Sequence, residues 1–259
     1  MDERIALVRR PSPRMSEGIV THIDRTPVDG ALAARQHAGY VAALDAAGWT
    51  IRQVPPADDL PDCAFVEDTA VVCDDLAVLA RPGVAERRPE VAGAEEALRA
   101  LGLEIARITE PGTLDGGDVL QVGRTVYVGR GGRTDGEGIR QLRAHLAGRG
   151  RTVVPVPLAR VLHLKSAVTA LPDGTFVAAD PSLLDASPFP TLRLMPEEAG
   201  SHVVLTGGGG VLMAASAPRS AELLDDLGFD VMVVDIGEFE KMEGCVTCLS
   251  VLVPQPSGP

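Results

Sequence analysis

The sequence predicts an α/β protein that forms one domain from repeated strand and helix units. Only 3% of its residues are aromatic while 45% are hydrophobic, so Val, Leu, Ala and Ile must build most of the core. The Val-rich runs are short and are bounded by Gly, Asp or Pro, which is typical of strands. Segments rich in Ala, Leu, Glu and Arg lie between these runs and favour helices. A length of 259 residues suits a single compact unit.

In chain order, the first predicted element is a strand in the apolar run RIALVRRP. Four hairpins follow, each with two apolar runs around a polar or Gly-rich turn: DTAVVCDDLAVLARPG, GGDVLQVGRTVYVGRGG, SAVTALPDGTFVAAD and VVLTGGGGVLMAAS. The predicted helices cover residues 31–47, 88–101, 136–147 and 219–227. The last strand, CLSVLVP, has no partner after it, so we expect it to pair with the first strand.

The spacing of four polar residues indicates an internal repeat. Asp68, Asp115 and His163 recur at intervals of 47 and 48 residues, and Cys248 follows the fourth hairpin at a comparable distance. A fixed period in this range is typical of a repeated supersecondary unit. Five such units closed on themselves would form a propeller-like ring, in which the four residues converge on one central pocket. An ordinary α/β sheet is the alternative explanation of the same alternation.

The composition excludes several classes of partner. The chain has 24 Lys and Arg residues against 36 Asp and Glu residues, a formal net charge of −12. Nucleic acids and anionic membranes bind basic surfaces, so we expect neither, and a cationic small molecule fits better. No segment resembles a signal peptide or a spanning helix, which favours a cytoplasmic protein with reduced thiols. A homodimer remains open.

Cys245 and Cys248, in the segment KMEGCVTCLS, have the spacing of a redox pair or of half a zinc site. A zinc site usually needs a second close pair of ligands, and the five histidines provide none. A redox pair requires its first cysteine at the start of a helix, whereas we expect this segment to run directly into a strand. Two inert buried thiols remain an alternative. The other hypothesis is that Cys248, at the mouth of the strand, is a nucleophile.

Four motifs in this order resemble those of the dimethylarginine dimethylaminohydrolases, which are guanidino-group-modifying enzymes with the pentein fold. They are FVEDTAVV at Phe65, LDGGDVL at Leu114, HLKS at His163 and KMEGCVTCLSVL at Lys241. The resemblance implies a five-bladed α/β propeller with pseudo-fivefold symmetry, formed by residues 1–259 as a single domain. It also implies a mobile lid at about residues 11–18, a disordered tail at about 254–259, and a hydrolase with no metal or organic cofactor.

The resemblance implies a catalytic role for three residues. Cys248 would be the nucleophile, His163 the general acid and base, and Asp115 the carboxylate that orients the histidine. A guanidinium carbon is a poor electrophile because resonance flattens it, so a thiolate suits the attack better than a hydroxyl group. The expected reaction converts asymmetric dimethylarginine or monomethylarginine to citrulline and dimethylamine or methylamine, through a covalent thiouronium on the cysteine.

The resemblance also implies which residues bind the substrate. The guanidinium needs carboxylates that accept its N–H groups, and its carboxylate end needs a cation. The positions that match are an acidic cradle, a phenyl ring packed beside it, and two arginines: Asp62, Glu67, Asp68, Phe65, Arg87 and Arg133.

Other functions remain open from the sequence. An arginine deiminase or an amidinotransferase of the same superfamily would use the same residues on another guanidine or with an acceptor amine. A non-catalytic amino-acid-binding protein would keep the ring alone, and a zinc or redox protein would depend on Cys245 and Cys248. Cys245 replaces the apolar residue usual in the family, so a regulatory disulfide and a small buried substitute are both open.

Overall fold

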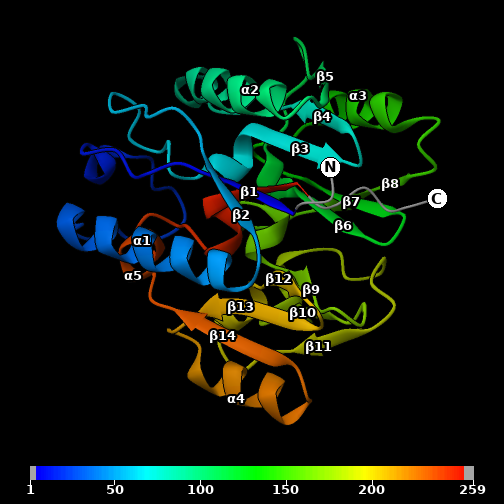
Figure 1. The fold of residues 1–259 in the computed structure, drawn as a ribbon. Helices are drawn as coiled ribbons and strands as arrows, with labels where there is room; N and C mark the ends of the chain where they lie inside the picture. The colour runs from blue at the N-terminus through cyan, green and yellow to red at the C-terminus, as the bar shows by residue number, and fades with distance from the viewer. Residues whose placement is uncertain (1–3, 254–259) are drawn as a thin grey trace.

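The repeated unit of the sequence is a three-stranded sheet. A computed structural model describes residues 4–253, and this part of the chain contains five such sheets (Figure 1). The predicted tail at 254–259 lies outside the described residues. In each sheet, two antiparallel strands form a pair, and a third strand runs parallel to the middle one. The strands therefore do not form one continuous sheet.

The order of strands is the same in every sheet, from the first strand of the pair to the parallel third strand. All four predicted hairpins are confirmed as antiparallel pairs. The sheets are β15–β1–β2 (Ser250–Val253, Ile5–Val8, Thr50–Gln53), β3–β4–β5 (Ala70–Cys73, Leu76–Leu79, Glu104–Arg107), β6–β7–β8 (Val119–Val122, Thr125–Arg130, Thr152–Pro157), β9–β10–β11 (Thr169–Ala170, Phe176–Ala178, Leu192–Leu194) and β12–β13–β14 (Val204–Gly207, Gly210–Ala214, Asp230–Val234).

Helices connect the second and third strands of four sheets and lie on the outside of the ring (Figure 1). In the sheet β9–β10–β11 a single 3-10 turn takes this place, and Pro188 and Pro190 in the connection cannot donate helical hydrogen bonds. The four predicted helices are confirmed as α1 (Gly30–Ala46), α2 (Val91–Ala100), α3 (Gly136–Leu146) and α4 (Pro218–Asp226), and a short helix α5 (Gly237–Glu240) precedes the last motif.

The two ends of the described chain meet in one sheet. β1 pairs with β15 from Ile5 opposite Val253 to Val8 opposite Ser250, which confirms the predicted pairing. All four residues of β1 are buried, because the strand lies between two neighbouring strands and is covered on both faces. The pairing closes the ring. No helix among residues 4–253 is both long and apolar enough to cross a membrane.

A short 3-10 turn precedes the first strand of every sheet. The turns η2, η4, η5 and η8 contact one another in sequence around the centre of the ring, so they meet at the same end of it. Cys248 lies in η8, which leads directly into β15; the residue is at the mouth of the strand as expected, but the strand begins at Ser250 rather than at Cys248. The turns are η2 (Val66–Thr69), η4 (Gly116–Asp118), η5 (Leu164–Ser166), η7 (Glu198–Ser201) and η8 (Val246–Leu249).

Candidate active site

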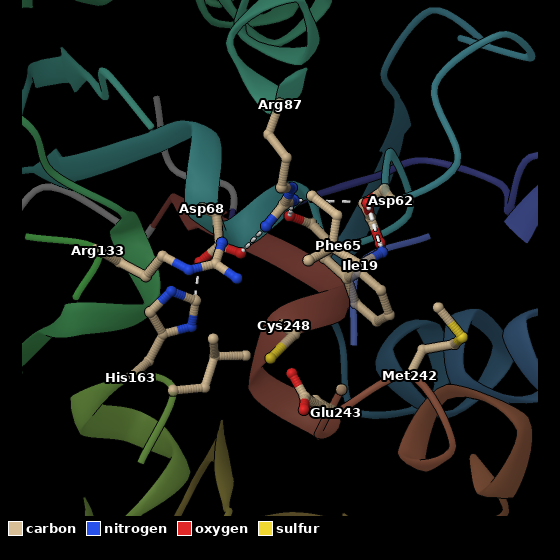
Figure 2. Close-up of a pocket in the computed structure, with 12 residues that line it drawn as sticks. Ile19, Asp62, Phe65, Asp68, Arg87, Arg133, His163, Met242, Glu243 and Cys248 are labelled. Carbon is tan, nitrogen blue, oxygen red and sulfur yellow. Dashed lines mark hydrogen bonds and ion pairs between the residues drawn. The ribbon is translucent and has the colours of Figure 1, made fainter. Parts of the chain in front are cut away.

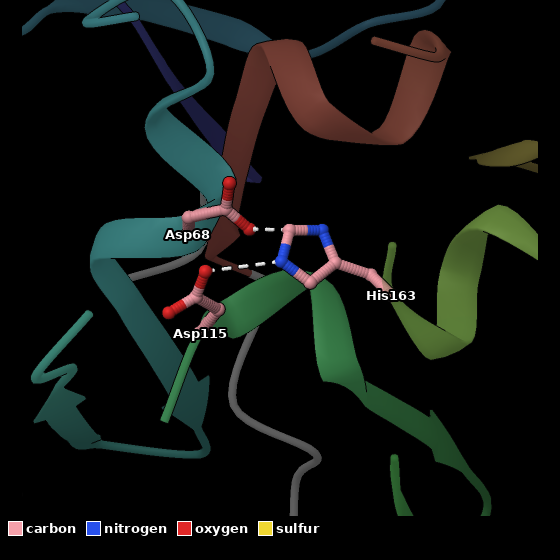
Figure 3. Close-up of side chains that lie close together, drawn as sticks. All are labelled: Asp68, Asp115 and His163. Carbon is pink, nitrogen blue, oxygen red and sulfur yellow. Dashed lines mark hydrogen bonds and ion pairs between the residues drawn. The ribbon is translucent and has the colours of Figure 1, made fainter. Parts of the chain in front are cut away.

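His163 and two carboxylates form the centre of the site (Figure 3). His163 and Asp115 each immediately precede a 3-10 turn, and their side chains meet with 3.0 Å between Nε2 and Oδ2. The other ring nitrogen, Nδ1, lies 3.8 Å from Oδ1 of Asp68. A Cβ atom on Gly117 would lie only 2.7 Å from the Asp68 carboxylate and from the imidazole. The second glycine of LDGGD is therefore required for this close approach.

The charges around His163 keep it protonated. Burial alone would lower its pKa, but the charge of Asp68 and the hydrogen bond to Asp115 raise the pKa to about 9. Burial alone would likewise raise the pKa of Asp68, but His163 and Arg87 lower it to about 2. At neutral pH the site thus holds an imidazolium beside a carboxylate, and this imidazolium has a proton to give.

Cys248 points its sulfur into the same pocket, near His163 (Figure 2). The thiol is buried and its sulfur lies 3.2 Å from the sulfur of Cys245. The contact with Cys245, the burial of the group and the charges of Glu67 and Asp68 raise the pKa of the Cys248 thiol. We therefore expect a neutral thiol in the empty pocket. A cation bound there would offset the two carboxylates and favour the thiolate.

The pocket is lined by acidic, basic and apolar side chains together, which suits a ligand that carries both charges. The predicted convergence of Asp68, Asp115, His163 and Cys248 is observed, with Asp115 behind the imidazole. The lining also includes residues that sequence analysis did not identify. The lining residues are Ile19, Asp62, Phe65, Asp68, Arg87, Arg133, Leu162, His163, Met242, Glu243, Gly244 and Cys248.

Glu67 is the predicted cradle residue that does not line this pocket. Its carboxylate accepts hydrogen bonds from Lys165 Nζ at 2.6 Å and from Thr247 Oγ1 at 3.1 Å, and it borders a second cavity between the first strands of the sheets. Burial raises the pKa of Glu67 to about 7, although Lys165 opposes the shift. Adjacent residues of a 3-10 turn point in different directions, so Asp68 faces the pocket and Glu67 does not.

The two predicted arginines differ in their partners. Arg87 is buried and pairs with Asp68 at 2.6 Å and with Glu90 at 2.7 Å. Arg133 forms a longer ion pair with Asp115, at 3.7 Å. Both line the pocket, but two carboxylates already compensate the charge of Arg87. Glu90 was not predicted, although its position three residues after Arg87 on a helical segment could have indicated the pair.

Two carboxylates hold residues 19–23, which directly follow the predicted lid at about 11–18, at the edge of the pocket. Asp62 accepts the backbone N–H of Ile19, with 3.2 Å to each oxygen, so it lies at the loop rather than beside Asp68 (Figure 2). Glu243 accepts the backbone N–H of Thr21 at 2.7 Å and of Ile23 at 3.0 Å, and it also bonds the N–H of the residue between them. The sequence offered no signal for Glu243, because its partners are about 220 residues away.

Asp118, the last residue of LDGGD, is a further residue that sequence analysis missed. It is fully buried and its Oδ1 accepts the backbone N–H of Leu164 at 2.9 Å, which fixes the turn that carries His163. Burial raises its pKa to about 6, against the charge of His163. Asp118, which immediately precedes β6, thus positions the turn that carries the histidine.

Asp68, Asp115 and His163 are also spaced as metal ligands could be, because one ligand atom from each lies within 4.8 Å of the others. Each of these atoms has a partner in the protein. Asp115 bonds the imidazole, Asp68 pairs with Arg87, and Arg133 adds a further positive charge beside the carboxylates. The donors present therefore fit a protonated histidine better than a divalent cation.

Comparison with known proteins gives one consistent result, although no family model matches the chain. A relative from Streptomyces coelicolor named N(G),N(G)-dimethylarginine dimethylaminohydrolase is 58% identical over 251 residues, 97% of each chain. A histidine-to-glycine variant of a dimethylarginine dimethylaminohydrolase, an adduct with S-methyl-L-thiocitrulline, matches with a TM-score of 0.91 and 31% identity, over 98% of this chain and 100% of the other. A cysteine-to-serine variant of DDAH from Pseudomonas aeruginosa, complexed with citrulline, matches with a TM-score of 0.88, 31% identity and the same coverage.

Proposed function

This chain belongs to the dimethylarginine dimethylaminohydrolase family, and we propose that Cys248, His163 and Asp115 carry out its reaction. The protein is a hydrolase that converts methylated arginines to citrulline and releases dimethylamine or methylamine. One observation carries the assignment of residues: the Asp115–His163 pair opens on the same pocket as the sulfur of Cys248.

The pocket fits a substrate that is cationic at one end and anionic at the other. The guanidinium lies against Asp68, between the cysteine and the histidine, where the carboxylate accepts its N–H groups. Phe65 packs beside the aliphatic part of the substrate. Arg133, together with Arg87, binds the carboxylate of the amino acid, and Asp62 at the lid faces its amino group. The charges of these lining residues support this orientation.

The first step forms a covalent intermediate. The bound guanidinium lowers the pKa of the Cys248 thiol, and the thiolate attacks the guanidinium carbon to give a tetrahedral adduct. The His163 imidazolium then protonates the departing amine, the C–N bond breaks, and a thiouronium remains on the sulfur. The pKa of about 9 at His163 supports this role, because the proton is present at neutral pH.

The second step hydrolyses the intermediate with the same residues. The imidazole of His163, now neutral, takes a proton from a water molecule, and the hydroxide attacks the thiouronium carbon. The C–S bond breaks, citrulline forms, and Cys248 leaves as a thiolate. Asp115 keeps the ring in one orientation throughout and stabilises the imidazolium each time it forms. A segment that includes residues 11–18 acts as a lid and excludes bulk water.

The reaction needs a reduced thiol, and four free cysteines are buried in the chain. These thiols suit a reducing compartment, which supports a location in the cytoplasm.

Citrulline formation from asymmetric dimethylarginine, monomethylarginine and arginine, measured side by side, tests the proposed function. Cys248→Ser is the blank. We expect citrulline from the two methylated substrates and none from the variant. Citrulline chiefly from arginine would make the protein a deiminase. Transfer of the amidino group to an added amine, without citrulline, would make it an amidinotransferase. No product from any of the three would contradict the proposal.

A further inference from the structure

Cys245 has no part in the reaction described above, yet it lies against the nucleophile. The two sulfur atoms are 3.2 Å apart, and the backbone N–H of Cys245 points at the sulfur of Cys248 over 3.4 Å. The Cys245 sulfur also contacts Thr247 Oγ1 at 3.3 Å. Cys245 is buried and does not line the pocket, whereas Cys248 does. A reagent in the pocket therefore reaches Cys248 first.

The backbone between the two cysteines has a shape that accepts a disulfide. The sequence argued against a redox pair because a strand was expected here, but Cys245 precedes the 3-10 turn η8 and Cys248 is its third residue. A hydrogen bond of 3.1 Å from the N–H of Cys248 to the carbonyl of Cys245 closes this turn. The first and fourth Cα atoms of such a turn lie within about 7 Å, and a disulfide spans about 4.4–6.8 Å. Side-chain rotation alone can thus bring the sulfurs together.

We propose that Cys245 is a resolving cysteine, which forms a reversible disulfide with Cys248 after a peroxide has oxidised the nucleophile in the empty pocket. The disulfide blocks turnover, since the nucleophile is no longer free. It also protects the enzyme, because a sulfenic acid without a neighbouring thiol is oxidised further to the sulfinic acid, which is irreversible in most proteins. The inference rests on the proposed function only for its effect on activity.

The chemistry balances in two steps. The sulfur of Cys248 attacks one oxygen of the peroxide and the O–O bond breaks. The thiol proton passes to the departing oxygen, which leaves as an alcohol or water, and the sulfur becomes a sulfenic acid. The sulfur of Cys245 then attacks the sulfenic sulfur, the S–S bond forms, and the hydroxyl group leaves as water with the proton of Cys245. The protein loses two electrons and the peroxide gains them. The separation of 3.2 Å between the two sulfur atoms favours the second step.

The other two cysteines do not compete for this bond. Cys63 contacts the carbonyl of Arg10, and Cys73 contacts the carboxylate of Asp74 in the first hairpin. Both are buried and neither lines the active-site pocket. Cys63 therefore provides a matched control, a buried cysteine outside the pair.

The test uses the full chain, exposed to hydrogen peroxide without substrate and then treated with dithiothreitol. The wild-type protein and Cys63→Ala should lose activity together with the mass of two hydrogen atoms, yield a peptide cross-linked between Cys245 and Cys248, and recover with the reductant. Cys245→Ala and Cys245→Val, each compared with its own activity before oxidation, should gain oxygen on Cys248 and not recover. Two small variants are used so that poor folding of one leaves the other informative.

The outcomes separate this inference from the proposed function. Loss of activity in the wild-type protein with oxygen added to Cys248 and no cross-link would overturn the inference while leaving the nucleophile in place. Equal recovery of the Cys245 variants would overturn it as well. A complete cross-link with activity retained would confirm the redox pair and instead contradict the role of Cys248 in the reaction.

Discussion

His163 carries the acid–base chemistry, and its charge depends on the two carboxylates beside it. Its pKa is raised from 6.5 to about 9 in the folded protein. A raised pKa means that the bound proton stabilises the fold fully below pH 6.5, and that this contribution is lost as the pH rises through 9. We expect the ring signals of His163 in NMR spectra to titrate near pH 9. A midpoint near 6.5 would contradict the account.

Asp115→Asn tests the other half of this pair. The amide is neutral and no longer stabilises the positive charge of the imidazolium, so the pKa of His163 should fall. Citrulline formation should then drop by about 10²–10⁴-fold. The loss should be greater at pH 8 than at pH 6, because more of the imidazole is then neutral. Asp185→Asn is the matched control and should keep full activity, because Asp185 is exposed and its side chain bonds Ser187, away from the site. Equal activity of the two variants would remove Asp115 from the mechanism.

Asp68 separates binding from reactivity. Asp68→Asn removes the charge that faces the guanidinium, and loss of a buried charge partner costs about 2–5 kcal/mol. The Kd for asymmetric dimethylarginine should therefore rise by at least about 30-fold. Alkylation of Cys248 by iodoacetamide should be as fast or faster, since Asp68 raises the pKa of the thiol. Unchanged binding in calorimetry, or slower alkylation, would refute this assignment.

At the scale of elements, the 3-10 turns explain where prediction from sequence succeeded and failed. The period placed Asp68, Asp115, His163 and Cys248 at one end of the ring, because equivalent positions of a repeat face the same way. The period could not predict which way the Glu67 side chain points, because it does not show which residues of a turn face the pocket. For the same reason Cys248 was expected in a strand, and the turn that brings the Cys245 sulfur close to it was not predicted.

The loop from η1 (Met15–Glu17) to Ile23 is the element whose contacts could not be predicted, and Glu243 anchors it. Glu243→Ala should raise KM by about tenfold with a smaller change in kcat, because three backbone N–H groups lose a charged acceptor. Amide hydrogen exchange at Thr21 and Ile23 should become faster, and Glu243→Asp should restore part of the protection. Glu240→Ala, on the neighbouring helix, is the control. A higher KM without faster exchange would mean that Glu243 acts on the substrate and does not anchor the loop.

The whole molecule depends on closing the ring between its two ends. The strand pairing was predictable, because CLSVLVP had no partner after it and RIALVRRP had none before it. The sheet without a helix departs from the repeated unit of hairpin, strand and helix that the period suggested, because Pro188 and Pro190 interrupt the connection. The contact between the loop near residue 20 and Glu243 was not predictable, because nothing in the sequence relates these two distant segments.

Leu7→Ala tests this closure. Leu7 is fully buried in β1, where it faces Val251 of β15, and such a truncation costs about 2–5 kcal/mol of the free energy of unfolding. Leu205→Ala, at a site that is 41% exposed, should cost less than about 0.5 kcal/mol. Urea unfolding should show one transition with a lower midpoint for Leu7→Ala. Two separate transitions, or equal midpoints, would show that the ends are not part of one cooperative unit.

The most direct test of the central claim is the capture of the intermediate on Cys248. Without His163 a departing amine receives no proton, but a thiolate leaving group needs none, so His163→Gly should react with S-methyl-L-thiocitrulline and then be unable to hydrolyse the product. We predict a stable mass gain equal to the reagent minus methanethiol, mapped to Cys248, and no adduct from asymmetric dimethylarginine. An adduct on Cys245 or Cys63, or none on a variant that circular dichroism shows to be folded, would contradict the account.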